Sequence, residues 1–172
     1  MNGMTRRELQ LTDRADILHI LNTAQILHLG LCDDGEPYVV PMNYGYEMTD
    51  DGRLFLYVHG AVQGKKLDIM RKNPRIFVEM ECDIAPFTGD VACRYGMSYR
   101  SLMGRGTAVF VDDPQEKMHA LSVLMKTQTG EDFTFTEPLA RIVAIVRLEI
   151  DEYTAKHRPT PKTRPCSSDS TH

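Results

Sequence analysis

The chain has 172 residues, of which 42% are hydrophobic and 26% charged, the composition of one ordinary globular domain. No apolar run approaches the roughly 20 residues that a membrane-spanning helix needs, and the start MNGMTRRELQ lacks the apolar stretch of a secretory signal, so we expect a cytoplasmic protein. The net charge of −4 at pH 7 would repel a polyphosphate backbone, so we expect no nucleic-acid partner, and because no long apolar run is present we expect no membrane partner.

Local signals predict the elements of the first half of the chain. Hydrophobic periodicity and turn residues indicate, in chain order, a helix over 12–23, strands over 24–32, 36–47 and 53–60, and a helix over 62–73. Thr12 is placed to cap the first helix. Asp33-Asp34-Gly35 has the composition of a tight hairpin turn, and Pro74 stops the second helix.

The second half begins with a strand and ends with a tail. The pattern indicates a strand over 74–82, an irregular loop over 83–97, a long strand over 98–112, a helix from 114 and a last strand over 141–150. Gly104 and Gly106 in the long strand indicate a bulge or the close approach of another backbone. Asp113 supplies the cap of the helix that follows. Residues 1–158 therefore predict one domain, and the proline- and serine-rich residues 159–172 predict a mobile tail.

Six strands in hairpin-rich order, with helices between some of them, favour a mostly β fold. We expect a closed antiparallel barrel with flanking helices, because the βαβ rhythm of a doubly wound sheet is absent from the sequence. The signatures GxGxxG, GxxxxGK[ST], HExxH and GxSxG are also absent from it, which argues against the common nucleotide-binding, protease and esterase motifs.

The cysteines predict free thiols and no metal site. Cys32, Cys82, Cys93 and Cys166 lie far apart and form no CxxC pair. Cys82 and Cys93 would form half of a metal site only if His28 or His119 came near. Unpaired cysteines are the commoner case.

The most informative stretch joins the third strand to the second helix. LYVHGAVQGKKLDIMRKNP places His59-Gly60-Ala61 at the end of a strand and Lys65 and Lys66 near the first turn of a helix. The helix dipole disfavours each cation there by about 0.3 to 1 kcal/mol, unless an anion binds between the ammonium groups and the free backbone amides. A bound phosphate group would remove this conflict.

Small residues at this corner fit the same interpretation. Gly60, Ala61 and Gly64 would let a ligand approach the backbone, because larger side chains would fill the space that a phosphate and its attached chain need. The alternative is a plain solvated face, formed by Lys65, Lys66, Arg71 and Lys72. The residues alone leave both interpretations open.

Three segments carry a family resemblance. PYVVPMNYGYE, LYVHGAVQGKKLDIMRKNP and SYRSLMGRGTAVFVDDPQEK resemble, in this order, the signatures of the pyridoxamine-phosphate-oxidase-like FMN-binding split-barrel proteins, over residues 24–153. They are most similar to the nitroimidazole-resistance branch. The resemblance implies a six-stranded split barrel, a homodimer, and an FMN-dependent oxidoreductase that uses a small-molecule electron donor and acceptor. A nitro compound is one candidate acceptor.

The resemblance also implies a set of cofactor-binding residues. They are Pro41, Met42, Asn43 and Tyr44, whose backbone and side chains line the isoalloxazine ring, His59, Gly60 and Ala61 beside the ribityl chain, Lys65 and Lys66 at the phosphate, and Tyr99 and Ser101, which reach the cofactor across the dimer interface. Pyridoxamine phosphate oxidases proper carry an arginine-rich phosphate site. The pair Lys65-Lys66 stands in its place here, so we do not expect vitamin B6 oxidation.

His59 has three interpretations. It is a proton donor to a substrate, a flavin contact, or a surface imidazole. With an ordinary pKa of about 6.5, a histidine exchanges a proton near neutral pH, so a catalytic role is chemically reasonable. In the nitroimidazole-resistance branch, a histidine at the matching place is part of the pocket.

A second class of function stays open. The barrel would be a binding module that holds FMN or haem for storage, sensing or transfer without turnover, and His59 or His28 would then serve as a haem ligand. A deazaflavin in place of FMN also stays open. The visible spectrum separates flavin from haem, because flavin absorbs near ~450 nm and haem gives an intense Soret band.

Overall fold

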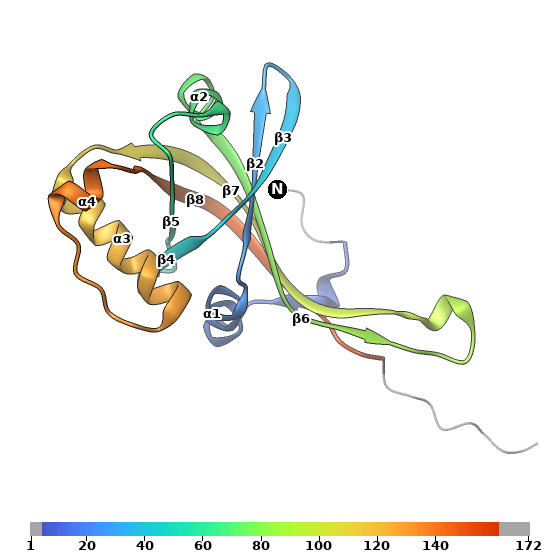
Figure 1. Cartoon of the computed structure of the whole chain (residues 1–172). Coiled ribbons are helices and arrows are strands. Elements are labelled where there is room, and N and C mark those ends of the chain that lie inside the picture. Colours follow the sequence, from blue (N-terminus) through green and yellow to red (C-terminus); the bar gives the residue numbers. More distant parts are fainter. Residues whose placement is uncertain (1–4, 162–172) are drawn as a thin grey trace, which may run out of the picture.

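One curved antiparallel sheet organises the structure (Figure 1). The computed structural model describes residues 5–161. The strands are β1 (Gln10–Leu11), β2 (Leu27–Asp33), β3 (Glu36–Met42), β4 (Tyr44–Met48), β5 (Leu54–Gly60), β6 (Arg75–Phe87), β7 (Gly96–Val111) and β8 (Ala144–Arg158). The helices are α1 (Arg14–Thr23), α2 (Lys65–Lys72), α3 (Pro114–Thr129) and α4 (Glu137–Arg141), with short 3₁₀ turns at Arg7–Leu9 and Ala92–Arg94. Neighbouring strands follow the order β3-β2-β6-β7-β8-β5-β4, and β1 pairs with β8.

A single residue, Asn43, ties the two ends of this sheet together. β3 and β4 stand at opposite ends of the strand order, yet Met42 ends β3 and Tyr44 begins β4. The twist of the sheet lets it curl until these ends meet, which makes a split barrel. The predicted split barrel with flanking helices is confirmed. The sheet has eight strands rather than six because residues 36–47 form two strands and β1 is added.

Local end signals place the helices near their predicted positions. Asp13 caps α1 in place of the predicted Thr12, because its carboxylate accepts a hydrogen bond from the Ala15 amide at 2.7 Å. The start of α3 is as predicted, with the Asp113 carboxylate accepting from the Glu116 amide at 2.9 Å. No helix within residues 5–161 is long and apolar enough to cross a membrane. The tail predicted from residue 159 lies almost wholly outside the described residues.

β6 and β7 form an arm that leaves the barrel (Figure 1). The sequence predicts an irregular loop over 83–97, and this is correct only for residues 88–95, because the two strands stay paired as far as Phe87 and Gly96. Asp83 has a φ of 54°, and the register of the pairing shifts beside it. A bulge of this kind breaks the alternation of side chains while the pairing continues, which hides the strand from a periodicity argument.

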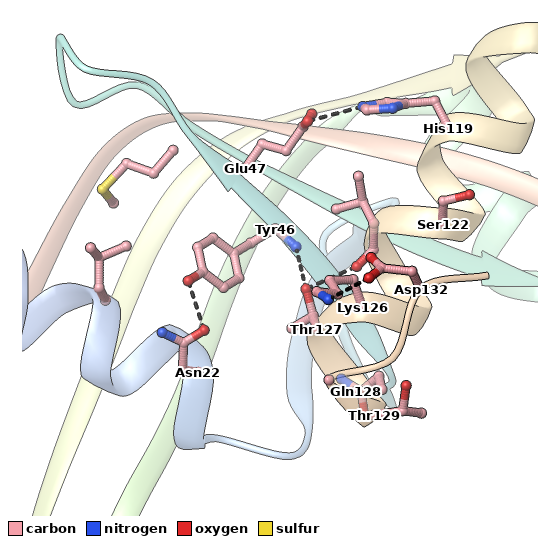
Figure 2. A pocket seen from close by; sticks show the side chains of 14 residues that line it. Asn22, Tyr46, Glu47, His119, Ser122, Lys126, Thr127, Gln128, Thr129 and Asp132 are labelled. Atoms are coloured by element: carbon pink, nitrogen blue, oxygen red, sulfur yellow. Dashed lines mark hydrogen bonds and ion pairs between the residues drawn. The ribbon is translucent and has the colours of Figure 1, made fainter. Parts of the chain in front are cut away.

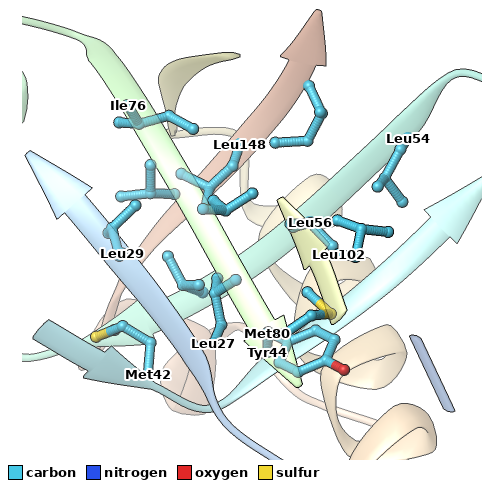
Figure 3. Packing of buried hydrophobic residues seen from close by; sticks show 14 of the residues in the cluster. Leu27, Leu29, Met42, Tyr44, Leu54, Leu56, Ile76, Met80, Leu102 and Leu148 are labelled. Carbon is cyan, nitrogen blue, oxygen red and sulfur yellow. The ribbon is translucent and has the colours of Figure 1, made fainter. Parts of the chain in front are cut away.

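Large aliphatic side chains fill the barrel (Figure 3). Six of them, from five different strands, have no exposed surface: Leu27, Leu29, Leu56, Met80, Leu102 and Leu148. Each side chain of this size stabilises the fold by about 1.5 to 3 kcal/mol when it is fully buried. The barrel interior is therefore a packed core.

α3 lies directly on the edge strand β4, and Gly45 makes this possible. A Cβ at Gly45 would lie 2.4 Å from the Cα of Leu124. α3 also satisfies the free edge of β4, where the Thr127 hydroxyl accepts from a strand amide at 3.3 Å and Gln128 Nε2 donates to the Tyr44 carbonyl at 2.7 Å. The helix thus covers an edge that would otherwise invite another strand.

The close backbone approach predicted in the long strand is confirmed at Gly106. A Cβ there would lie 2.1 Å from the carbonyl oxygen of Glu149. The register of β7 against β8 shifts between Arg105 and Gly106, which is the predicted bulge. Only glycine fits at this position without moving β8.

Candidate functional site

The chain passes from β5 into α2 through a short loop that leaves the helix N-terminus open. Gly64 precedes the first helical residue with a φ of 148°, a conformation that favours glycine. Within residues 5–161, no side chain caps this end of α2. Nothing lies within 4 Å of a Cβ built on Gly64, so the surrounding space is open. The free amides of an uncapped helix N-terminus favour an anion.

Lys65 and Lys66 place two positive charges beside this open end. Lys65 Nζ lies 3.4 Å from Asp33 Oδ2 and 5.3 Å from the centroid of the Tyr38 ring. Lys66 reaches back over β5, where a Cβ on Gly60 would lie 3.2 Å from its Nζ. Gly60 therefore makes room for the Lys66 ammonium. The two cations stand where the helix dipole alone disfavours them, as the sequence predicts.

His59 belongs to the same corner and has an unpartnered ring nitrogen. The side chain is half-buried, and Nδ1 is buried with no hydrogen-bond partner in the described part of the chain. Burial, with the nearby Lys66 charge, lowers the pKa of His59. The imidazole is therefore mostly neutral at pH 7. A buried nitrogen without a partner costs about 1 to 3 kcal/mol, which a hydrogen-bonding ligand would recover.

The junction of β3 and β4 is exposed on its outer side. Pro41 and Asn43 are exposed, and Met42 between them is 8% exposed. Asn43 Nδ2 donates to Gln128 Oε1 at 3.3 Å, and Gln128 in turn binds the β4 backbone. This bond orients the Asn43 amide from α3, a contact that the sequence pattern does not predict.

The Tyr44 side chain is unable to line a ligand, which corrects one sequence prediction. Its ring is fully buried, and its hydroxyl lies 2.9 Å from the Leu21 carbonyl and 3.0 Å from the Ala24 carbonyl. Burial raises the pKa of this phenol, so it remains a donor. Tyr44 therefore ties the end of α1 to the barrel, and only its backbone remains near the outer surface.

Tyr44→Phe should destabilise the protein by about 1 to 2 kcal/mol and leave ligand binding unchanged. The change removes the Tyr44 hydroxyl, which hydrogen-bonds to the Leu21 and Ala24 carbonyls at the end of α1. Urea unfolding measures the loss. Tyr46→Phe is the matched control, because its hydroxyl donates to Asn22 in a more exposed setting and should matter less. Equal stability of the two variants would contradict this assignment.

Tyr99 and Ser101 do not reach the corner within one chain. β8 pairs with β5 near Ile145, which faces Val111 on β7, whereas Tyr99 faces Arg158 at the other end of β8. Twelve residues of β7 separate Tyr99 from Val111, roughly 40 Å along a strand that rises about 3.3 Å per residue. These two residues are thus unable to join His59 and Lys65 unless a second copy supplies them.

A groove of about 920 Å³ lies on another side of the molecule, between α1, β4 and α3 (Figure 2). Its lining includes Asn22, Tyr46, Glu47, His119, Ser122, Lys126, Thr127, Gln128, Thr129 and Asp132. Glu47 accepts from Tyr57 at 2.6 Å and lies 2.9 Å from His119 Nε2. Among the described residues, none of the predicted cofactor-binding set lines this groove. It adjoins that set through Gln128, which contacts Asn43.

Fold and corner together define a class of protein. A split barrel carries, on its outer surface, an uncapped helix N-terminus with two lysines and a neutral histidine. This is a split-barrel protein with a cationic corner on its outer surface.

The chain belongs to the pyridoxamine 5'-phosphate oxidase family, whose model matches residues 13–157. Its structure is similar to that of a candidate 5-nitroimidazole antibiotic resistance protein from Bacteroides thetaiotaomicron, with 31% sequence identity and a TM-score of 0.74 over 87% of this chain and 86% of that one. The family resemblance seen in the sequence is thereby confirmed.

Two more distant structures share the fold. A flavocytochrome from Azotobacter vinelandii has 20% identity and a TM-score of 0.76 over 95% of this chain and 76% of its own. An FAD and haem binding protein from Mycobacterium smegmatis has 20% identity and a TM-score of 0.73 over 90% of this chain and 76% of its own. Proteins with this fold thus include some that are named for flavin and haem.

Proposed function

We propose that this chain binds FMN at the corner between β5 and α2 and acts as an FMN-dependent oxidoreductase. The observation that carries the proposal is the uncapped N-terminus of α2 flanked by Lys65 and Lys66. A phosphate monoester carries close to two negative charges at neutral pH, which matches two ammonium groups and free amides. A bound flavin supplies hydride and electron transfer, while the protein supplies binding, orientation and electrostatics.

The remaining residues of the corner fit the rest of such a ligand. The unpartnered His59 Nδ1 offers a hydrogen bond beside Gly60 and Ala61, where the ribityl chain would lie. Pro41, Met42 and the oriented Asn43 amide would border the ring, because they lie at the junction of β3 and β4. A flat ring needs such an apolar surface with a few directed hydrogen bonds.

The site is completed, in this proposal, by a second copy of the chain. Tyr99 and Ser101 lie at the far end of β7 and contribute to the cofactor only across a dimer interface. The Tyr99 ring packs 5.0 Å from Lys156 Nζ, which holds it in place on the sheet. The electron acceptor that we propose is a nitroaromatic compound, supported by the 31% identical relative from Bacteroides thetaiotaomicron.

Reconstitution tests the proposal directly. The full chain is mixed with FMN, freed of excess ligand, and its visible spectrum and its reduction of a nitroaromatic compound are measured with a nicotinamide donor. The expected result is retained flavin absorbance near ~450 nm together with turnover. Retained flavin without turnover would favour a storage or transfer module. A Soret band after incubation with haem, with no flavin retained, would overturn the FMN assignment.

His59→Ala should lower turnover about tenfold while FMN stays bound. Because the pKa of His59 is lowered, the protonated fraction of the imidazole becomes large only when the pH is below the ordinary pKa of a histidine. If His59 donates a proton, the rate rises as pH falls through that pKa, and this limb is lost in the variant. Stopped-flow rates across pH check the prediction. His119→Ala is the control, and equal rates in all three proteins would assign His59 to binding alone.

A further inference from the structure

A histidine and two glutamates meet on the outer face of the sheet, away from the corner. His28 on β2 faces Glu79 on β6 in the strand register, and Glu81 lies two residues further on the same face. His28 Nδ1 lies 3.3 Å from Glu79 Oε2 and 3.7 Å from Glu81 Oε2. One ligand atom from each side chain falls within 4.8 Å of the other two. The proposed flavin site uses none of these side chains.

Two of the three facing atoms form no hydrogen bond in the described part of the chain. His28 Nδ1 and Glu81 Oε2 are buried and form no hydrogen bond within residues 5–161. Buried polar atoms without partners are uncommon and costly, more so when two carboxylates share the place. A cation bound between these three side chains would give the unbonded atoms a partner.

The two distances from His28 Nδ1, 3.3 and 3.7 Å, are close to those between ligand atoms of a metal site. In a tetrahedral zinc site with bonds of about 2.0 to 2.2 Å, ligand atoms lie about 3.3 to 3.6 Å apart. Imidazole nitrogen with carboxylate oxygen is also a donor set that divalent transition metals accept. We propose that His28, Glu79 and Glu81 bind a divalent transition-metal ion. Three protein ligands leave a fourth position open on the outer face of the sheet.

A second cluster gives a useful contrast. His19, Cys82 and Asp83 also come together, but His19 Nε2 already bonds Asp83 Oδ2 at 2.8 Å, and Arg100 Nε lies 3.2 Å from the same oxygen. Burial raises the pKa of the Cys82 thiol to about 11, so its metal-binding thiolate is scarce. This cluster is satisfied internally. It therefore supplies the control.

The test uses the untagged full chain stripped of metal and titrated with Zn²⁺ by calorimetry at neutral pH. The wild type should bind Zn²⁺ at one site per chain, and Zn²⁺ should raise its unfolding temperature. His28→Ala and Glu81→Gln should each weaken binding at least about tenfold. His19→Ala should bind like the wild type, and circular dichroism confirms that each variant folds.

Three outcomes would overturn the metal site. The wild type shows no saturable Zn²⁺ binding, or His28→Ala and Glu81→Gln bind as tightly as the wild type, or only His19→Ala loses binding. If the wild type binds no Zn²⁺ and Glu81→Gln is less stable than it, the cluster is an internal ion pair. None of these results depends on FMN, so the test of the metal site is independent of the proposed flavin site.

Discussion

Replacing Lys65 and Lys66 together by alanine should weaken FMN binding at least about a hundredfold while the fold is kept. Each charge-assisted hydrogen bond to a phosphate contributes about 1.5 to 3 kcal/mol, and about 1.4 kcal/mol corresponds to a tenfold change in affinity. The free protein should lose little stability, because the cations oppose the helix dipole and the contact between Lys65 and Asp33 is exposed. Fluorescence titration with FMN and urea unfolding measure the two effects separately.

The matched control lies at the other end of α2, nearly two helical turns away. Arg71→Ala with Lys72→Ala removes the same charge from the last turn of α2, where both side chains are exposed. This variant should keep FMN affinity within a few-fold of the wild type, because only long-range attraction is lost. Comparable losses in the two double variants would mean that net charge, not the open helix end, attracts the ligand. Unchanged affinity after loss of Lys65 and Lys66 would refute the site.

Gly45→Ala should destabilise the protein by about 3 kcal/mol, the upper end of the usual cost of overpacking. The added Cβ would lie 2.4 Å from the Leu124 Cα and 2.5 Å from its backbone nitrogen. Since these are backbone atoms, no side-chain rotation relieves the contact, and α3 must move away from β4. Urea unfolding measures the change.

Two further variants make this prediction sharp. Gly30→Ala is the control, because its Cβ meets the Phe77 carbonyl at 3.3 Å and needs only a small shift, so about 1 kcal/mol or less is expected. Adding Leu124→Ala to Gly45→Ala should not restore stability, because the obstructing atoms remain. Equal stability of the Gly45 and Gly30 variants would show that α3 does not rest on β4 as closely as described.

The barrel could be predicted because most of its signals are local. The turn at Asp34-Gly35, with φ values of 53° and 96°, and the cap at Asp113 each depend on a few neighbouring residues. Hydrophobic alternation then placed the strands. Local patterns failed at Asn43, where one predicted strand divides, and at the arm, where a bulge at Asp83 breaks the alternation.

Only part of the candidate site could be predicted in the same way. The lysines of α2 and the histidine of β5 are near neighbours in the chain, so one stretch of sequence showed them together. The contact of Gln128 with Asn43 spans 85 residues, and the burial of the Tyr44 ring depends on the end of α1. Neither contact can be recognised from the hydrophobic periodicity of the sequence.

The amino-acid sequence by itself determined the elements, the family and the cationic corner, because turn chemistry, capping and helix dipoles act within a few residues. Tertiary structure alone decided which side chains face outward and which of the predicted site residues lie far apart. The pairing of β2 with β6 brought His28 to Glu79 and Glu81, and the length of β7 kept Tyr99 from His59. Strand pairing joins residues that are distant in the chain, and the sequence records neither its register nor its bulges.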